Sequence, residues 1–408
     1  MKNTLLIPFR FYKEAYTGLP REIWTIGIIT VINRMGTMVL PFLSVYLTTV
    51  LNFSLKDAGI LASAFGFGSL GGSYIGGKLT DRVGPRLVIT ASLLFGGVLF
   101  ICLQFAHSFI SIFLLIFSAS LFGEAYRPAM SAAIGMYSKP NEAGRAMAFN
   151  RLAINLGMSA APSIGGFIAV TIGYHWLFWV DGLTCIAAAL YFWMISKTWK
   201  RPMHATNNTL TQKTQDTASQ SPIKNTRYML FLISTFLMGF AFIQWFHTVP
   251  VFIKTDWAFD ERYIGILMGA SSLLVTLIEM PITHIVEQRN KIKFAIRIGL
   301  ALLCVCYLPF VLSPSLALCF VAMFLWTLGE ILLLPFNNAI PLSMSHEKNR
   351  GNYLAWYFMT WSLTNITAPT IGFTFIDHYG YTAFWWLLTL LIAISLFMNL
   401  VLGEKIIK

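Results

Sequence analysis

The amino-acid sequence predicts an all-α integral membrane protein, in which twelve transmembrane helices form two parallel-repeat six-helix bundles. Three observations lead to this fold class. The chain contains few charged residues, its long apolar runs have basic residues mainly on one side, and its second half repeats features of the first half.

The composition excludes a soluble globular protein. Of the 408 residues, 56% are hydrophobic and only 11% are charged, whereas a soluble domain carries about 25% charged residues. Such a chain cannot cover its surface in water, so we expect a lipid bilayer around it. The net charge of +12 does not indicate a nucleic-acid partner, because the basic residues lie in short loops without a basic stripe interleaved with aromatics.

Twelve apolar runs are each long enough to cross a bilayer, which takes about 20 residues in a helix. They cover residues 23–50, 57–78, 86–107, 109–137, 147–172, 175–197, 228–253, 262–286, 294–313, 316–342, 353–376 and 382–402. The longest polar segment between two runs, residues 198–227, predicts a flexible cytoplasmic linker. It would separate an N-terminal bundle, residues 1–197, from a C-terminal bundle, residues 228–408.

The basic residues indicate the orientation of these spans. If both ends of the chain are cytoplasmic, the outer loops contain only Lys56, Lys254 and Arg262. Arg34 and Arg127 lie inside apolar runs, and the other 24 of the 29 Lys and Arg residues lie on the cytoplasmic side. This asymmetry predicts that both termini are in the cytoplasm.

The internal repeat indicates how the two halves are related. Residues 161–165 match residues 368–372 at an offset of 207, and Gly123-Glu124 matches Gly329-Glu330 at an offset of 206. Six helices separate the matched positions, so both repeats have the same orientation. Parallel six-helix repeats around a central site are typical of transporters.

A short polar segment, residues 77–86, lies between the second and third apolar runs. It resembles the loop 2–3 motif of the major facilitator superfamily, Gly-x-Leu-Ala-Asp-Arg-x-Gly-Arg-Lys, with Thr80 and Pro85 as departures. The matching positions are Gly77, Leu79, Asp81, Arg82, Gly84 and Arg86.

The motif residues have expected roles in a conformational gate. Gly77 would let helix 2 approach a neighbour closely, and Gly84 would permit a tight turn. Asp81 is placed to meet the positive N-terminal end of another helix, and the resemblance implies that this is helix 11. Such a contact would latch the halves together while the cavity is open to the outside.

A second motif lies in the fifth apolar run. It resembles the helix 5 motif that is enriched in antiporters of the same superfamily, with alanine replacing one glycine. Its residues are Gly157, Ala161, Pro162, Gly165 and Gly166. The resemblance covers essentially the whole chain and implies the twelve-helix major facilitator fold.

Charged residues inside the apolar runs are the main candidates for function, because each costs about 2.5–3.5 kcal/mol or more at the bilayer centre. They are Arg34, Glu124, Arg127, Glu279 and Glu330. Glu124 and Arg127 share a helix face, and helices 1 and 4 both line the cavity in the superfamily. We therefore expect a proton-coupling cluster in which protonation of Glu124 releases Arg34 and Arg127. The alternative is a permanent ion-pair network.

Glu330 is the repeat mate of Glu124 but has no arginine near it in the sequence. A carboxyl group without a cationic partner in a membrane tends to be protonated, so Glu330 is a candidate proton site or a site for a cationic substrate. The alternative is a hydrogen-bonded carboxylic acid in the core. Arg151, near the cytoplasmic end of helix 5, is interpreted as a snorkelling or loop-pairing residue.

Polar and aromatic residues on other helices are candidates for the substrate cavity, although packing is the alternative for each aromatic. The candidates are Asn33, Gln244, Trp245, His247, Glu279, Asn337, Asn338 and Trp361. His247 could titrate near physiological pH. For Glu279, a contact between helices near the cytoplasmic gate is an equal alternative.

No motif indicates catalysis or a cofactor. The chain has neither Gly-x-x-x-x-Gly-Lys-Ser/Thr nor His-Glu-x-x-His. Its five cysteines lie in apolar runs without metal-ligand spacing to a histidine. We expect no enzyme and no metal site, but a monomeric transporter of small molecules in the bacterial inner membrane, driven by the proton gradient.

The direction of transport has two interpretations. The helix 5 motif favours proton-coupled export (antiport) of small amphipathic or drug-like molecules, as in multidrug efflux. Arg34 and Arg127-Pro128 resemble basic cavity residues of the peptide-transporter branch, which favours uptake (symport) of an anionic or zwitterionic solute such as a peptide or organic acid. That branch has acids where this chain has Thr30 and Asn33. A non-transporting receptor or scaffold with the same fold is a third interpretation.

Overall fold

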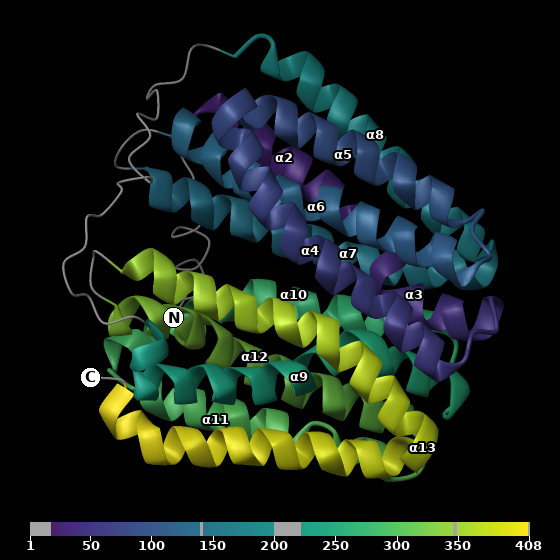
Figure 1. The fold of residues 1–408 in the computed structure, drawn as a ribbon, viewed down its shortest axis with the longest axis vertical. Coiled ribbons are helices and arrows are strands. Elements are labelled where there is room, and N and C mark those ends of the chain that lie inside the picture. Colours follow the sequence, from purple (N-terminus) through teal and green to yellow (C-terminus); the bar gives the residue numbers. More distant parts are fainter. Residues whose placement is uncertain (1–17, 139–141, 200–221, 346–348, 407–408) are drawn as a thin grey trace, which may run out of the picture.

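The computed structural model describes residues 18–138, 142–199, 222–345 and 349–406. All regular structure within these ranges is helical. Figure 1 shows two groups of long helices, one above the other. The upper group contains α2 (Arg21–Met35), α3 (Val39–Val45), the π-helix η1 (Tyr46–Val50), α4 (Leu55–Val83), α5 (Pro85–Leu103), α6 (Phe109–Tyr137), α7 (Ala143–Thr171) and α8 (Tyr174–Ser196).

The lower group follows the polar segment. It contains η2 (Pro222–Lys224), α9 (Thr226–Thr255), α10 (Glu261–Gln288), α11 (Ile292–Val305), η3 (Leu308–Val311), α12 (Leu316–Met344) and α13 (Arg350–Ile406). Most of the predicted linker, residues 200–221, lies outside the described residues, so the boundaries of the two bundles stay a prediction.

Eleven helices among the described residues are long and apolar enough to cross a membrane. The last of these, α13, is two helices joined at Gly380, whose φ of 78° and ψ of 169° are not helical. The protein is therefore a multi-pass membrane protein with the twelve segments that the sequence predicts. Most segment ends lie within a few residues of the predicted ones.

Three turns between consecutive helices consist of little more than one glycine. Gly84, Gly173 and Gly380 have φ angles of 83°, 99° and 78°, which a side chain would strain. Gly173 and Gly380 are also repeat mates at the offset of 207. The repeat therefore reproduces the turn between the last two helices of each half.

The polar segment at residues 77–86 is not a loop, contrary to the prediction. The helix α4 continues through it to Val83, and only Gly84 is non-helical before Pro85 starts α5. Proline suits the first position of a helix because the missing N–H has no partner there. At 29 residues, α4 is about 43 Å long, so its charged last turns extend past the apolar layer.

The first half is held together by close contact between the backbones of α4 and α6. A Cβ at Gly68 or Gly72 would overlap backbone atoms of α6, and a Cβ at Gly76 would lie 2.5 Å from the Cα of Ala125. These three glycines are four residues apart and form a small-residue stripe of the kind that lets membrane helices approach closely. Gly77 is not part of it, because nothing lies within 4 Å of an added Cβ there. The predicted close approach at Gly77 is therefore wrong in this conformation.

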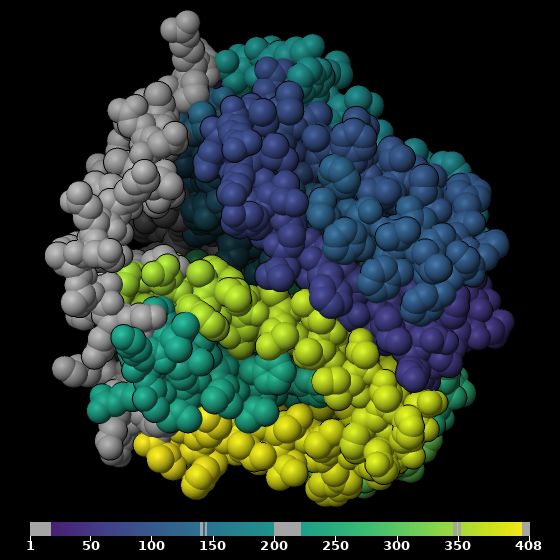
Figure 2. Space-filling model, in the orientation of Figure 1, coloured from purple at the N-terminus to yellow at the C-terminus, as the bar shows by residue number. Residues whose placement is uncertain are grey.

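The two halves meet chiefly where α4 packs against α13, α7 against α10, and α3 against α9. Between α4 and α13 the contact is limited to one end. A Cβ at Gly59 would lie 2.7 Å from the carbonyl oxygen of Pro369, and one at Gly66 would lie 2.8 Å from the backbone of Asn365. At the other end of α4, Asp81 is exposed. Figure 2 shows this face hollowed between the blue helices of the first half and the yellow-green start of α13.

Gly72→Ala tests the close packing of α4 on α6. The added methyl group meets the carbonyl group of Leu121, so we expect a stability loss of about 1–3 kcal/mol. The matched control is Gly71→Ala, where the nearest atom would be a flexible leucine methyl group at 3.5 Å. Thermal midpoints in detergent should fall for Gly72→Ala only, and equal midpoints would contradict the packing argument.

Candidate functional site

The predicted charged cluster of the first half is partly formed. The Nε of Arg127 lies 2.9 Å from Oε2 of Glu124, one turn away on α6. The Glu124 side chain is 11% exposed, whereas that of Arg127 is 62% exposed. Both residues are near enough to Arg34 of α2 to interact with its charge. The structure thus brings the three predicted residues together, with the ion pair formed between the two on α6.

Arg34 has a distinctive environment at the end of α2. Its Nε is buried and has no hydrogen-bond partner among the described residues. Its backbone lies against α7 at Gly157, where an added Cβ would be 2.5 Å from the Cβ of Arg34. A buried guanidinium nitrogen without a partner is costly, so this position is suited to receive an acceptor from another group.

Helix 1 is broken directly after Arg34. The helix α2 ends at Met35, and α3 begins at Val39. The carboxylate of Asp181, on α8, accepts hydrogen bonds from the backbone N–H of Met38 at 3.0 Å and of Val39 at 2.7 Å. These N–H groups belong to the first turn of a helix, where no intrahelical acceptor exists. Asp181 therefore stabilises the break.

Sequence reasoning did not single out Asp181. The signal was present, because it is an acidic residue inside the apolar run at residues 175–197. In the structure it is fully buried. Its partners are backbone groups of a distant helix, and no residue pattern reveals such partners.

The charged cluster of the second half includes a residue from the first half. Arg151 of α7 forms an ion pair with Glu279 of α10, and both are near enough to Glu330 of α12 to interact with its charge. Glu330 itself has no hydrogen bond or ion pair with any described residue. Arg151 is therefore not a snorkelling or loop-pairing residue as predicted, since it joins the two halves. Glu279 takes the alternative role, a contact between helices.

Two predicted cavity residues lie inside the second half instead. The Nε2 of Gln244 donates to the carbonyl oxygen of Ala368 at 2.7 Å, and Gln244 is fully buried. Trp245 is 2% exposed and stacks on Trp326 with ring centroids 5.1 Å apart. Both face the core because the apolar surface of α9 is buried almost all round. For these two residues the cavity prediction is wrong.

The other predicted cavity residues occupy four different places. His247 lies between the halves, with Nδ1 3.4 Å from the hydroxyl oxygen of Ser44 on α3. Asn337 donates to the hydroxyl oxygen of Tyr357 at 3.3 Å, and Tyr357 donates to Asn338. Trp361 is half-buried beside Phe242, and Asn33 faces the thiol of Cys185 at 3.8 Å.

The residues of the helix 5 motif contact two neighbours. Gly157 and Gly165 face helix 1, and a Cβ at Gly165 would lie 2.8 Å from the Cβ of Met38. Gly166 and Pro162 face α10 across the boundary between the halves, against Glu261 and Gly265. The motif therefore lets α7 lie close to both helices at once.

The predicted gate motif at residues 77–86 makes fewer contacts. Asp81 and Arg82 are exposed. Arg86 donates to the carbonyl oxygen of Trp193 at 3.1 Å and lies over its ring at 4.6 Å. No described residue pairs with Asp81, so the predicted latch to the eleventh span, which is the part of α13 before Gly380, is not formed in this conformation.

Together, the site consists of two charged clusters, one within the first half and one that crosses the boundary between the halves. Arg34, Glu124 and Arg127 carry one more positive than negative charge when ionised. Arg151, Glu279 and Glu330 carry one more negative than positive charge when ionised. Such groups can bind charged solutes and protons, which is the usual role of ionisable residues inside membranes.

Comparison with known proteins gives a family and several relatives. The family model described as Major Facilitator Superfamily matches residues 26–369 and, in a second match, residues 248–405. YqjV of Bacillus subtilis, named an uncharacterized MFS-type transporter, is 24% identical over 366 residues, which are 88% of this chain and 87% of YqjV. The multidrug resistance protein MdtG of Escherichia coli is 26% identical over 187 residues, which are 44% of this chain and 46% of MdtG.

Two solved structures are similar over nearly the whole chain. One is a POT family transporter in complex with 5-aminolevulinic acid, with a TM-score of 0.78 at 16% identity. The match covers 96% of this chain and 98% of that transporter. The other is the nucleoside transporter NupG, with a TM-score of 0.76 at 16% identity. The match covers 95% of this chain and 100% of NupG. At these identities the likeness concerns the fold alone.

Asp181→Ala tests the support of the helix break. We expect a loss of about 1–3 kcal/mol for each N–H left without an acceptor, seen as a lower thermal midpoint and faster amide exchange at Met38 and Val39. Asp181→Asn keeps one acceptor oxygen, so its effect should be smaller. The control Asp377→Asn changes an exposed residue and should leave both readouts unchanged. Unchanged amide exchange in Asp181→Ala would contradict this role.

Proposed function

The chain belongs to the Major Facilitator Superfamily of membrane transporters, and from this premise we propose that it is a secondary active transporter that exports small amphipathic or drug-like molecules in exchange for protons. Its place is the bacterial inner membrane, with both termini in the cytoplasm. It works as a monomer and needs no cofactor, because the proton gradient supplies the energy.

The observation that carries this proposal is the carboxyl group of Glu330. It is half-buried in α12 without a hydrogen bond or ion pair to any described residue, while Arg151 is engaged by Glu279. A carboxyl group in this setting can hold a proton, or it can release the proton and hold a cation. Competition between a proton and a cationic substrate for one carboxyl group is sufficient to couple their movements in opposite directions.

The shape of the molecule supports an alternating-access cycle. The halves touch at the predicted outer end, where Gly59 and Gly66 meet α13. They are hollowed at the predicted cytoplasmic end (Figure 2). A substrate from the cytoplasm would enter this hollow, and rocking of one half against the other would then expose it to the outside.

Aromatic side chains support an amphipathic substrate. Phe242 stacks on Trp326 with centroids 4.6 Å apart, and Trp361 stands edge-on to Phe242 at 5.9 Å. Trp361 is half-buried and would offer a ring face to an apolar or cationic group. The multidrug function in the name of MdtG points to the same class of substrate.

A second candidate function is proton-coupled uptake of a small anion or zwitterion. It is favoured by the positive balance of the cluster of Arg34, Glu124 and Arg127 and by the unpartnered Nε of Arg34. A guanidinium group with an unpaired N–H can donate hydrogen bonds to a carboxylate. Reconstitution in proteoliposomes with an imposed pH gradient distinguishes the two functions. Proton flux is compared for cationic dyes, dipeptides and organic acids.

Glu330→Gln should abolish proton-coupled transport while the protein still folds, because an amide cannot release a proton. Glu124→Gln should have the same effect if its cluster is part of the coupling. Substrate-driven proton flux in proteoliposomes is the measurement, with Glu287→Gln as control, since Glu287 is an exposed carboxylate at the end of α10. Full coupled transport in both variants would remove the proton-site assignment.

Asp81→Asn should shift the protein toward the conformation open at the cytoplasmic end. The proposed contact of Asp81 with the eleventh span, the first part of α13, forms only when that end closes. Its loss therefore destabilises only the state that is closed at the cytoplasmic end. Thiol labelling of the cavity from the cytoplasmic side should become faster. Asp57→Asn, at the opposite end of α4, is the matched control. An unchanged labelling rate in Asp81→Asn would count against the latch.

A further inference from the structure

Two basic residues share one aromatic ring at the predicted cytoplasmic end of the first half. The guanidinium carbon of Arg86, at the start of α5, lies 4.6 Å from the ring centroid of Trp193 on α8. The ammonium nitrogen of Lys197, the residue directly after α8, lies 5.3 Å from the same ring centroid. An aromatic ring attracts cations that lie over its face. The Trp193 ring therefore holds two positive charges close together.

Neither cation is paired with an acidic side chain in the described part of the chain. Arg86 makes one hydrogen bond there, from Nη2 to the carbonyl oxygen of Trp193 at 3.1 Å, and its Nε has no partner. Lys197 is exposed and makes no hydrogen bond or ion pair with a described residue. Glu22 of α2 is near Tyr137, as Arg86 is, but it forms no ion pair with Arg86. Two positive charges and several N–H donors are therefore available to a ligand.

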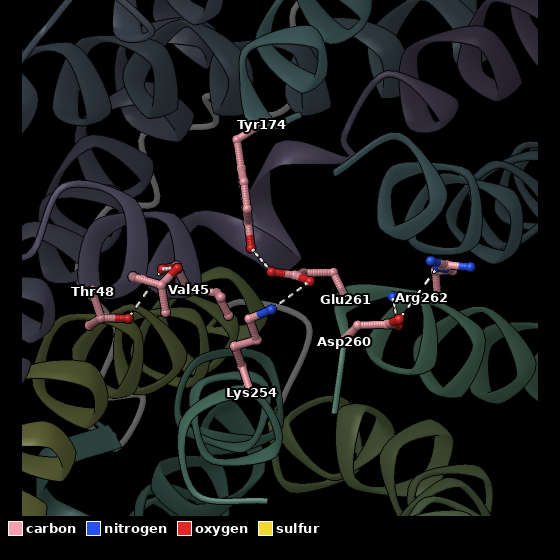
Figure 3. A network of polar contacts seen from close by, with 8 residues as sticks. Val45, Thr48, Tyr174, Lys254, Asp260, Glu261 and Arg262 are labelled. Atoms are coloured by element: carbon pink, nitrogen blue, oxygen red, sulfur yellow. Dashed lines mark hydrogen bonds and ion pairs between the residues drawn. The ribbon is translucent and has the colours of Figure 1, made fainter. Parts of the chain in front are cut away.

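Basic residues at the predicted outer end are matched by acids of the chain itself. Figure 3 shows Glu261, the first residue of α10, between two partners. The ammonium group of Lys254, on α9, donates to Oε2 at 3.0 Å, and the hydroxyl group of Tyr174, on α8, donates to Oε1 at 2.6 Å. Glu261 therefore also bridges the two halves. Arg262 pairs with Asp260 at 3.4 Å. The two cations at the predicted cytoplasmic end lack such partners, and an anion from outside the chain would supply the missing charge.

The surroundings of the two cations face lipid and not the hollow. Figure 1 shows α5 and α8 at the edge of the first half, on the side away from the second half. Leu190, Met194 and Lys197 lie on one face of α8, because they are three or four residues apart. The two apolar side chains are 54% and 69% exposed, and Leu87, next to Arg86 on α5, is 50% exposed. An acyl chain can therefore lie on these side chains while a headgroup lies at the cations.

We propose that Arg86, Lys197 and Trp193 form a binding site for the phosphate group of an anionic phospholipid from the surrounding bilayer. The phosphate accepts hydrogen bonds from the guanidinium group of Arg86 and from the ammonium group of Lys197, whose exposed side chain turns toward it. Basic residues at the membrane surface attract anionic lipids. A zwitterionic lipid binds less well, because its own cation meets two like charges.

The site is separate from the transport chemistry. It requires neither a proton nor a substrate, so it does not rest on the proposed function. Arg86 belongs to α5 and Lys197 to the end of α8, and a phosphate group bound by both links these two helices at the predicted cytoplasmic end. The bound lipid therefore stabilises the first half.

Native mass spectrometry of the full-length protein in detergent measures the binding. The protein is freed of lipid and titrated with dioleoylphosphatidylglycerol, which gives the apparent dissociation constant of the first bound lipid. Dioleoylphosphatidylcholine has the same acyl chains and a phosphate group with an added cation, and it is titrated in parallel. Thermal midpoints with each lipid, and with inorganic phosphate alone, provide a second readout.

We expect phosphatidylglycerol to bind more tightly than phosphatidylcholine and to raise the thermal midpoint. Inorganic phosphate should not raise it, because it has no acyl chains. Lys197→Gln should weaken phosphatidylglycerol binding about fivefold, and Arg86→Gln at least as much. Because Lys197 is exposed, its variant serves if Arg86→Gln does not fold. The matched control is Lys78→Gln, since the exposed Lys78 is the one cation over the ring of Tyr74 among the described residues, at 4.4 Å. It should bind the lipid as the parent does.

Three results would overturn the proposal. The first is a dissociation constant for phosphatidylglycerol that stays unchanged in Arg86→Gln and Lys197→Gln, or that Lys78→Gln raises equally. The second is equal binding of phosphatidylcholine, which would remove the preference for an anionic lipid. The third is a rise of the midpoint with inorganic phosphate that these two variants abolish, because the phosphate group would then come from solution and not from the bilayer.

Discussion

A charge inside a bilayer must be paired or reach water, and the structure of this protein depends on that constraint. The charges are met in three ways. Glu124 pairs with Arg127 one turn away on the same helix, whereas the Arg151–Glu279 pair and the bridge of Glu261 connect the two halves. Asp181 accepts hydrogen bonds from two backbone N–H groups at a helix break. Two of the contacts between the halves therefore depend on a carboxyl group.

Apart from these charged contacts, the two halves pack through small residues. Where α4 meets α13 and where α7 meets α10, the contact is made by glycine and other small residues that bring backbones together. Backbones in such close contact need no large side chains between them at these glycines. In the conformation seen here, the halves are joined at Gly59, and Figure 2 shows a hollow between the first half and the start of α13.

Much of the candidate site was predictable because it follows from the cost of charge in lipid. Arg34, Glu124 and Arg127 were expected to lie together, and they do. Gln244 and Trp245 were expected in the cavity but lie in the core, because α9 is apolar on nearly all sides and its sequence does not reveal which face is outward. Arg151 was misinterpreted since its partner, Glu279, is on a different half of the chain.

The sequence by itself determined the membrane character, the twelve segments, the parallel repeat and the family. These follow from composition and from local patterns, which need no knowledge of neighbours in space. Only the tertiary structure showed that residues 77–83 are helical and that Glu261 bridges the halves. It also showed that helix 1 is broken where its backbone N–H groups donate to Asp181. Each of these depends on contacts between residues far apart in the chain, and their free energy is set by burial and by partners that no local pattern contains.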